Sequence, residues 1–243
     1  MVTNVVLVER KEVANGTMAF TFEKPAGFDY KPGQFVDITL TALADSVVGG
    51  NSRSLSLASA PSEPRLMVAT RLRGTAFKEQ LQEIPLGTAV QIDGPYGRLT
   101  LPEDATQPVV FLAGGIGITP FRSMIVQEAQ SRSSRPLTLF FANRRVEDAP
   151  FHEELESLSR RHTPFRLVST LSDPGAGAVP WRGETGYITA EMIRRHPTSS
   201  AGTGRRPIYY IVGPPKMVEA MRAVLNELHV PADEIRTEFF VGY

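Results

Sequence analysis

The chain has 243 residues, enough for one large domain or two modest ones, and its 42% hydrophobic and 21% charged residues are typical of an ordinary globular protein. The formal net charge is zero, which argues against a nucleic-acid-binding protein that relies on overall positive charge. No cysteine occurs, which excludes disulfides, a thiolate nucleophile and a cysteine-ligated iron–sulfur cluster within these residues.

The amino-terminal segment meets the charged residues Glu9, Arg10 and Lys11 before a signal-type apolar core could form. No apolar run approaches the roughly 20 residues that span a bilayer. We therefore expect a cytoplasmic protein without a membrane partner.

The first part of the chain is predicted to form short β-strands. Residues 5–14 and 17–25 flank Asn15-Gly16, which is a tight hairpin signal. Four further alternating apolar runs, separated by Gly, Pro and Ser, cover 33–40, 52–59, 65–72 and 88–93. Many short strands with turn signals between them predict a closed antiparallel β-barrel. One amphipathic segment, 75–84, predicts a helix with Thr75 as its N-cap.

The pattern changes near residues 101–108. Strand-like apolar runs then alternate with amphipathic helix-like runs; the strands are predicted at 108–114, 136–143, 165–171, 207–213 and 235–243, and the helices at 119–130, 149–161, 189–196 and 214–229. Such alternation predicts a doubly wound parallel sheet. We therefore predict a β-barrel domain at 1–103 and an α/β domain at 104–243. The Gly- and Pro-rich stretch 172–187 is predicted to be a loop and a candidate mobile flap.

Two strand–helix turns carry the strongest signals for a ligand. The strand at 108–114 ends in Gly114-Gly115, Gly117 follows, and Thr119-Pro120 begin a helix. Glycines let the backbone approach a phosphate closely, and a helix amino terminus attracts the phosphate charge. Gly213 and Pro214 repeat the arrangement. Two such turns beside the switch point of a parallel sheet open onto one crevice, which favours a nucleotide site over a turn that binds nothing.

Six motifs occur in one order along the chain: R-S-L-S (53–56), G-T-A-F (74–77), G-P-Y-G (94–97), G-G-I-G-I-T-P (114–120), G-P-P-K-M (213–217) and E-F-F (238–240). Together they resemble the ferredoxin–NAD(P)H reductase superfamily, which includes flavodoxin reductases and the reductase components of oxygenases. The resemblance implies that the barrel binds FAD, or less favourably FMN, and that the α/β domain binds NAD(P)H. Hydride then passes to the flavin, and single electrons pass to a separate ferredoxin, flavodoxin or oxygenase component.

On the flavin side, the resemblance implies that Arg53 contacts the pyrophosphate and that Ser56 places its hydroxyl near the flavin N5. The other flavin-lining residues that it implies are Ser54, Leu55, Val68, Thr70, Arg71, Gly74, Thr75 and Ala76. The family usually has an aromatic residue where this chain has Leu55, and leucine cannot stack on the flavin ring. A change in flavin affinity or potential is therefore expected. The basic residues within 53–78 could instead dock an acidic electron carrier.

On the nicotinamide side, the resemblance places the three turn glycines at the dinucleotide pyrophosphate and Thr119 close to the nicotinamide; Gly213 and Pro214 form the opposite wall. Val212 stands where the family often has a cysteine near the hydride-donating carbon. The adenosine ribose is expected beside Asn143, Arg144 and Arg145. Two arginines without an acid tilt the prediction towards NADPH over NADH, although either arginine could simply be solvated.

At the carboxyl end, Glu238 and Phe240 match family positions beside the flavin and the nicotinamide. Together with Ser56 they form the predicted catalytic set. Phe240 is expected to cover one face of the flavin, with Phe239 and Tyr243 as alternatives, and burial for packing alone fits Phe239 better.

Two other functions stay open. An NAD(P)H:flavin reductase would release reduced flavin, and Leu55 gives it some support. A non-catalytic nucleotide-binding subunit of a larger complex is the other.

The four histidines have no metal-like spacing, so no metal site is predicted.

Overall fold

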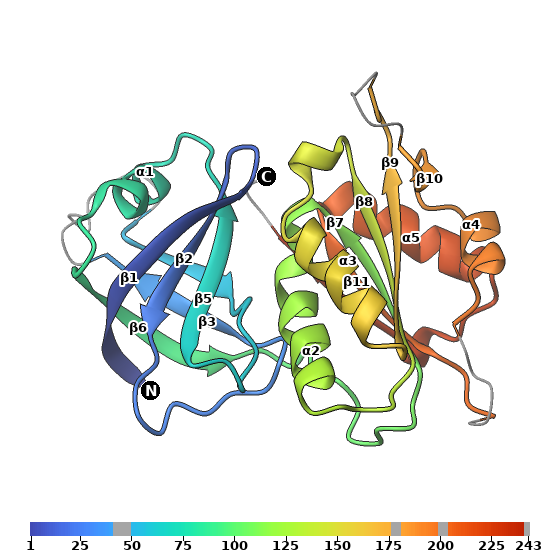
Figure 1. The fold of residues 1–243 in the computed structure, drawn as a ribbon, viewed down its shortest axis with the longest axis horizontal. Helices are drawn as coiled ribbons and strands as arrows, with labels where there is room; N and C mark the ends of the chain where they lie inside the picture. Colours follow the sequence, from blue (N-terminus) through green and yellow to red (C-terminus); the bar gives the residue numbers. More distant parts are fainter. Residues whose placement is uncertain (41–49, 176–180, 199–203, 241–243) are drawn as a thin grey trace. The chain divides into compact units, whose positions relative to one another are not determined.

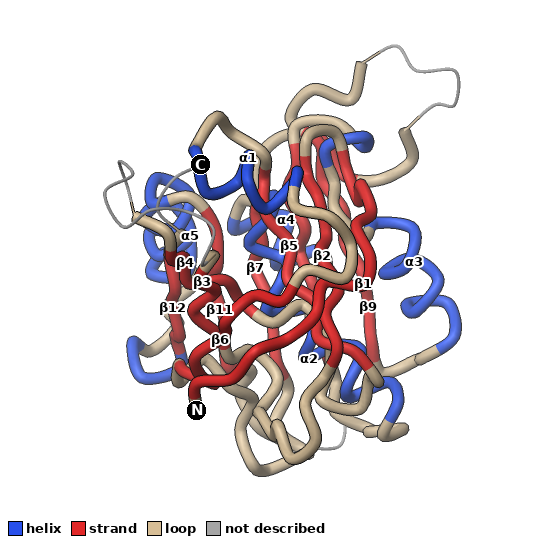
Figure 2. Tube along the Cα trace, turned by 90° about the vertical axis from the view of Figure 1, so that its left-hand side faces the viewer, coloured by secondary structure: helices blue, strands red, loops and turns tan. Residues whose placement is uncertain are grey.

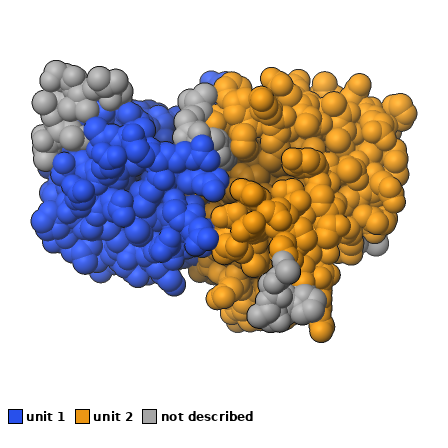
Figure 3. All heavy atoms as spheres, turned by 90° about the horizontal axis from the view of Figure 1, so that it is seen from above, with its two compact units in different colours: residues 1–101, 119–127 blue, residues 102–118, 128–243 orange. Residues whose placement is uncertain are grey.

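A computed structural model describes residues 1–40, 50–175, 181–198 and 204–240. The chain divides into two compact units, drawn in different colours in Figure 3. Unit 1 contains residues 1–101 and 119–127, and unit 2 contains residues 102–118 and 128–243. Helix α2 (Ile118–Gln130) is thus shared between them, since its middle residues cluster with unit 1. The boundary predicted between residues 103 and 104 stays a prediction.

Unit 1 is a six-stranded antiparallel sheet in the order β4-β3-β6-β1-β2-β5. An isolated antiparallel bridge between Leu57 and Val68 connects the two ends of this sheet and closes it into a barrel. The predicted antiparallel barrel is therefore confirmed; Figure 2 draws its strands in red. They are β1 (Val2–Ala14), β2 (Thr17–Glu23), β3 (Phe35–Thr39), β4 (Ser52–Ser56), β5 (Arg65–Arg71) and β6 (Ala89–Tyr96).

Local sequence explains the barrel's elements. Gly16 adopts φ +61° between β1 and β2, as the Asn-Gly hairpin signal requires. The inward-facing side chains of β1, Val5 and Leu7, are almost completely buried with the barrel core. Helix α1 (Ala76–Glu83) packs Phe77 and Leu81 against the same core, and the Thr75 side chain caps it by accepting a hydrogen bond from the Lys78 N–H.

Unit 2 is a six-stranded parallel sheet in the order β10-β9-β8-β7-β11-β12. All six residues of β7 are buried, as expected for a strand covered on both faces. The chain runs outward from β7 in one direction and then returns to β11, so the topological switch point lies between β7 and β11. The strands are β7 (Val109–Gly114), β8 (Leu137–Asn143), β9 (Phe165–Leu171), β10 (Glu184–Thr185), β11 (Ile208–Gly213) and β12 (Ile235–Phe239).

Helices cover both faces of this sheet. Helices α4 (Ala190–Arg195) and α5 (Pro215–Glu227) share a buried apolar cluster with β7, β8 and β11, and Figure 1 shows α3 (His152–Arg161) on the opposite face. The predicted helices and parallel strands are thus confirmed. Of the predicted flap, residues 176–180 lie outside the described part of the chain, and β10 lies within the remainder. None of the described helices is long and apolar enough to cross a membrane.

Candidate functional site

A group of cations gathers at the amino terminus of α1 in unit 1. The Arg53 guanidinium lies 5.3 Å from the centroid of the Phe77 ring and donates to the Ser52 carbonyl at 2.6 Å. Burial lowers the pKa of Lys78, and the positive charges of Arg53 and Arg73 lower it further. Arg53 and Arg73 therefore both lie within electrostatic reach of Lys78.

Space is open beside these cations. A Cβ added at Gly74 would have the Oε1 atom of Glu79, 4.0 Å away, as its nearest heavy atom, so a carboxylate from the first turn of α1 also borders this space. The first N–H groups of α1 follow directly at Thr75 and Ala76. Helix amino termini and clustered cations both stabilise phosphate groups. The residues present therefore fit a diphosphate, and we name this region the cationic cradle: Arg53, Arg73, Gly74, Thr75, Ala76 and Lys78.

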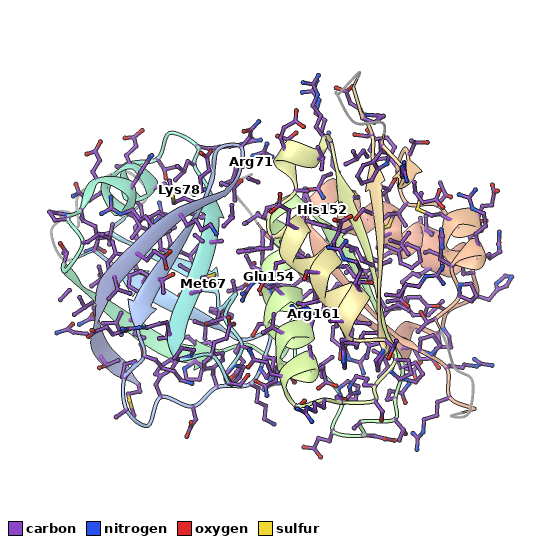
Figure 4. The ribbon with its side chains drawn as sticks, viewed as in Figure 1. Met67, Arg71, Lys78, His152, Glu154 and Arg161 are labelled. Atoms are coloured by element: carbon purple, nitrogen blue, oxygen red, sulfur yellow. The ribbon has the colours of Figure 1, made fainter. Side chains whose placement is uncertain are left out.

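The other residues predicted to line the flavin lie on β4 and β5, which the Leu57–Val68 bridge brings together. Leu55 packs partly against the barrel core, and Ser56 is 7% exposed. Ser54 lies on the face of β4 opposite Leu55, and its hydroxyl donates to the Asp37 carboxylate on β3. Val68 and Thr70 are buried, so their side chains belong to the barrel interior, and Arg71 ends β5 (labelled with Lys78 in Figure 4).

In unit 2 the two predicted glycine turns pack directly on each other. A Cβ added at Gly117 would overlap the backbone at the end of β11, with the Val212 carbonyl carbon 2.7 Å away and the Gly213 nitrogen 3.0 Å away. Gly115 adopts φ +52° in the short 3-10 turn Gly115–Gly117 that leads into α2. Both turns therefore meet at the switch point, as the sequence predicts, with Pro214 opening onto α5 and Thr119 buried in the first turn of α2.

The carboxyl end of β12 lies beside the same turn. Glu238 pairs with Val212 in the parallel register, and the Phe240 N–H donates to the Gly213 carbonyl at 3.2 Å. Burial raises the pKa of Glu238, so this carboxyl keeps its proton to a higher pH than an exposed glutamate. Phe239 is 60% exposed, so the interpretation of Phe239 as a packing residue is wrong: β12 is an edge strand and turns this ring outward. Tyr243 lies outside the described residues.

The residues predicted at the adenosine ribose lie at and just after the end of β8, and an acid from elsewhere in unit 2 contacts two of them. The Oδ1 atom of Asn143 is buried without a hydrogen-bond partner. Arg144 and Arg145 both pair with Asp173, the second residue after β9; the Asp173 Oδ2 atom lies 3.4 Å from Arg144 Nη2 and 3.0 Å from Arg145 Nη2. Asp173 escapes notice in the sequence because it comes from the neighbouring strand, 28 residues beyond Arg145. The sequence did contain one indication of this contact. β8 and β9 were predicted as strands of one parallel sheet, and adjacent parallel strands bring their carboxyl ends together.

A cavity of about 890 Å³ lies next to this group in unit 2, between α3, β9 and residues 181–183, and Arg145 and Glu147 line its edge. His152, labelled in Figure 4 at the start of α3, contacts Ser169 Oγ through Nε2 at 3.0 Å. Burial lowers the pKa of His152, which favours the neutral ring. Trp181 donates from Nε1 to the Glu184 carbonyl at 2.7 Å, so this ring is held in the wall of the cavity.

Comparison with known proteins places these features in a family. The model of the oxidoreductase NAD-binding domain matches residues 111–223. Ferredoxin–NADP reductase B of Sorangium cellulosum is 32% identical over 224 residues, which cover 90% of this chain and 89% of that protein. The chain belongs to the ferredoxin–NAD(P)H reductase superfamily.

A solved structure shares the fold over nearly the whole chain, and a second curated relative matches in sequence. The FAD/NAD-binding domain of nitric oxide dioxygenase from Vibrio cholerae aligns with a TM-score of 0.79 and 21% identity, covering 98% of both chains. The reductase component of propane 2-monooxygenase from Mycolicibacterium smegmatis is 30% identical over 90% of this chain. This chain spans only 61% of the length of that reductase component.

The resemblance implies an aromatic residue at position 55 and a cysteine at position 212, where this chain has aliphatic side chains. Leu55 packs partly against the barrel core. Val212 is completely buried, and its carbonyl group lies against the turn that contains Gly117.

Proposed function

We infer that this protein takes hydride from NAD(P)H onto a bound FAD and passes single electrons to a separate ferredoxin, flavodoxin or oxygenase component. The observation that carries the inference is the cationic cradle, a diphosphate-type site on a closed antiparallel barrel in a chain whose other unit matches an NAD-binding domain. A cytoplasmic location is part of the same proposal.

Each group of residues has its own role in the proposed function. The cationic cradle would hold the flavin diphosphate, with Arg53 as its fixed charge, and Ser56 would place its hydroxyl near the reacting flavin nitrogen. The turns at Gly114–Gly117 and Gly213 would hold the coenzyme pyrophosphate at the switch point. A bound flavin supplies the step between two-electron and one-electron chemistry. Protein residues mainly orient the two ring systems, because hydride moves directly between them.

At the end of β12, Glu238 and Phe240 complete the proposed set. The raised pKa of Glu238 suits a carboxyl that holds a proton at the edge of the site. Phe240 remains our proposal for the ring over the flavin. The outward exposure of Phe239 makes that residue the closest rival.

The identities of the flavin and of the coenzyme are also proposals. FAD is favoured over FMN because the cradle suits a diphosphate, whereas FMN carries a single phosphate. The sequence-based tilt towards NADPH assumed two arginines without an acid, and Asp173 changes that premise. The alternative of an NAD(P)H:flavin reductase rests on Leu55, since an aliphatic side chain grips a flavin less firmly than a stacked ring.

Anaerobic reduction tests the proposed function. We expect the purified protein to be yellow, to release FAD on denaturation, and to bleach when NADH or NADPH is mixed with it in a stopped-flow instrument. Rapid loss of flavin on dilution, with activity restored by free flavin, would support the flavin reductase instead. Yellow protein that neither coenzyme bleaches would identify a nucleotide-binding subunit and overturn the proposal.

Arg53→Met is expected to weaken flavin binding about 10- to 100-fold, because it removes a charge-assisted contact to the diphosphate. Arg53→Lys should recover only part of the loss, since a lysine lacks the planar fork of donors. The measurement is the dissociation constant of FAD with the apoprotein, followed by flavin fluorescence. Arg65→Met is the matched control on the same barrel, where Arg65 is half-exposed and pairs only loosely with Glu23. Equal flavin affinity in both methionine variants would contradict the assignment of Arg53.

A further inference from the structure

Asp173 pairs with Arg144 and Arg145, the two arginines that the proposed function places beside the adenosine ribose of the coenzyme. Two backbone hydrogen bonds extend the β8–β9 ladder past its end: the Ser172 N–H donates to the Asn143 carbonyl at 3.1 Å, and the Asp173 N–H donates to the Arg144 carbonyl at 2.9 Å. The position of Asp173 beside the two arginines is therefore set by backbone pairing, and does not depend on the arginine side chains alone.

The Arg145 guanidinium is engaged by this carboxylate through two nitrogens. Its Nε donates to Asp173 Oδ2 at 3.1 Å, and its Nη2 lies 3.0 Å from the same oxygen. The pairing lowers the pKa of Asp173 and raises that of Arg145, so both stay charged at neutral pH. This fork of donors is the geometry that an arginine offers to a phosphate, and here a carboxylate already takes it.

Asp173 is not the only acid near Arg145. The carboxylates of Glu147 and Asp148 also act on Arg145, while Arg144 acts on Asp173 together with Arg145. A ribose 2′-phosphate would bring close to two more negative charges to this place. A ribose 2′-hydroxyl brings none, and it can donate to a carboxylate.

We propose that Asp173 is the residue that determines coenzyme specificity, and that it makes the protein select NADH over NADPH. The inference rests on the proposed function, since it concerns the same coenzyme site. Asp173 acts in two ways: its carboxylate accepts a hydrogen bond from the 2′-hydroxyl of NADH, and its ion pairs with Arg144 and Arg145 withhold these cations from the 2′-phosphate of NADPH.

Equilibrium binding of two adenosine fragments to the purified holoprotein tests this selectivity without any redox step. The probes are adenosine 5′-monophosphate and adenosine 2′,5′-bisphosphate, measured by isothermal titration calorimetry. The parent is expected to bind the monophosphate at least about tenfold more tightly, which is the size of one charge-assisted hydrogen bond. Asp173→Asn should strengthen binding of the bisphosphate about tenfold and weaken that of the monophosphate. Glu227→Gln is the control, because Glu227 pairs with exposed Arg194 at 3.4 Å in an otherwise similar ion pair.

The outcomes separate the two proposals. The role of Asp173 is overturned if the parent protein prefers the bisphosphate. It is also overturned if Asp173→Asn has the same ratio of affinities as the parent. In either case, flavin reduction by either coenzyme would still support the proposed function. If neither coenzyme bleaches the flavin and neither fragment binds, the proposed function fails and the specificity proposal fails with it. A double variant, Asp173→Asn with Arg145→Met, should lose the gain for the bisphosphate, because that gain depends on the released guanidinium.

Discussion

Arg122→Met is expected to lower the free energy of unfolding by about 3 kcal/mol, the cost of leaving one member of a buried ion pair without its partner. Arg122 lies on α2 in unit 1, where its side chain is 4% exposed. Its Nη1 and Nη2 atoms reach the two carboxylate oxygens of Glu63 at 3.0 and 3.2 Å, and Nη1 also donates to the Ala58 carbonyl at 2.7 Å. The variant would leave both acceptors without these donors.

The same region holds a second set of buried hydrogen bonds, which join α2 to residues 58–67. Ser123 donates to the Ser59 carbonyl at 2.6 Å, Tyr30 donates to that carbonyl at 3.0 Å, and the Ser59 Oγ atom accepts from the Met67 N–H at 2.9 Å. Burial raises the pKa of Tyr30 well above its usual value, so its hydroxyl stays a donor at any pH the protein meets. Residues 58–67 and this part of α2 are therefore held as one unit.

Urea unfolding followed by circular dichroism measures the effect of the Arg122 substitution. Arg65→Met, which breaks an exposed pair with Glu23 on the same barrel, should cost less than 1 kcal/mol and serves as the control. The double variant Arg122→Met with Glu63→Leu should recover much of the loss, because it leaves no charge unpaired in the site. If Arg122→Met lowered the free energy of unfolding no more than Arg65→Met does, the prediction would be wrong, and water would be replacing the Arg122 guanidinium at little cost.

Elements of this fold were predictable where a local pattern carries the information. The Asn15-Gly16 hairpin, the Thr75 cap and the Gly114–Gly117 turn each depend on a few consecutive residues, and each lies where the sequence predicts. The parallel sheet follows from runs of buried residues such as β7. Its switch point follows from strand order, which explains why both glycine turns were expected at one crevice.

Features that depend on distant pairs were not predictable in this way. Arg122 and Glu63 are 59 residues apart, and no local sequence pattern in either segment predicts their pairing. The same holds for the clustering of α2 with the barrel. The carboxylate that pairs with both Arg144 and Arg145 is that of Asp173, which follows the next strand, β9, so it lies outside the segment after β8. Burial for packing alone was one alternative for Phe239, and it is wrong, because this residue of the edge strand β12 is 60% exposed.

Gly117→Ala is expected to weaken coenzyme binding about 100-fold and to lower the free energy of unfolding by about 1–3 kcal/mol. The added methyl group would overlap the Val212 carbonyl, which belongs to backbone and cannot rotate away. Val212 lies in β11, which pairs with β7 on one side and with β12 on the other, so a shift of β11 breaks ladder hydrogen bonds on both sides. The alternative, a shift of the turn Gly115–Gly117, moves the amino terminus of α2 away from its place at the switch point.

Gly114→Ala is the matched control, because it adds the same methyl group to the same turn. Its nearest neighbour is the sulfur of Met217, the far end of a flexible side chain, so the clash can be relieved by rotation. Gly114→Ala should therefore cost less than Gly117→Ala, and Gly114→Ala with Met217→Ala should relieve the remaining overlap. Calorimetric titration with NADH and thermal unfolding measure the two effects. Equal losses in the two single variants would mean that the turn tolerates no side chain at all, and that the contact with β11 is not what requires glycine at 117.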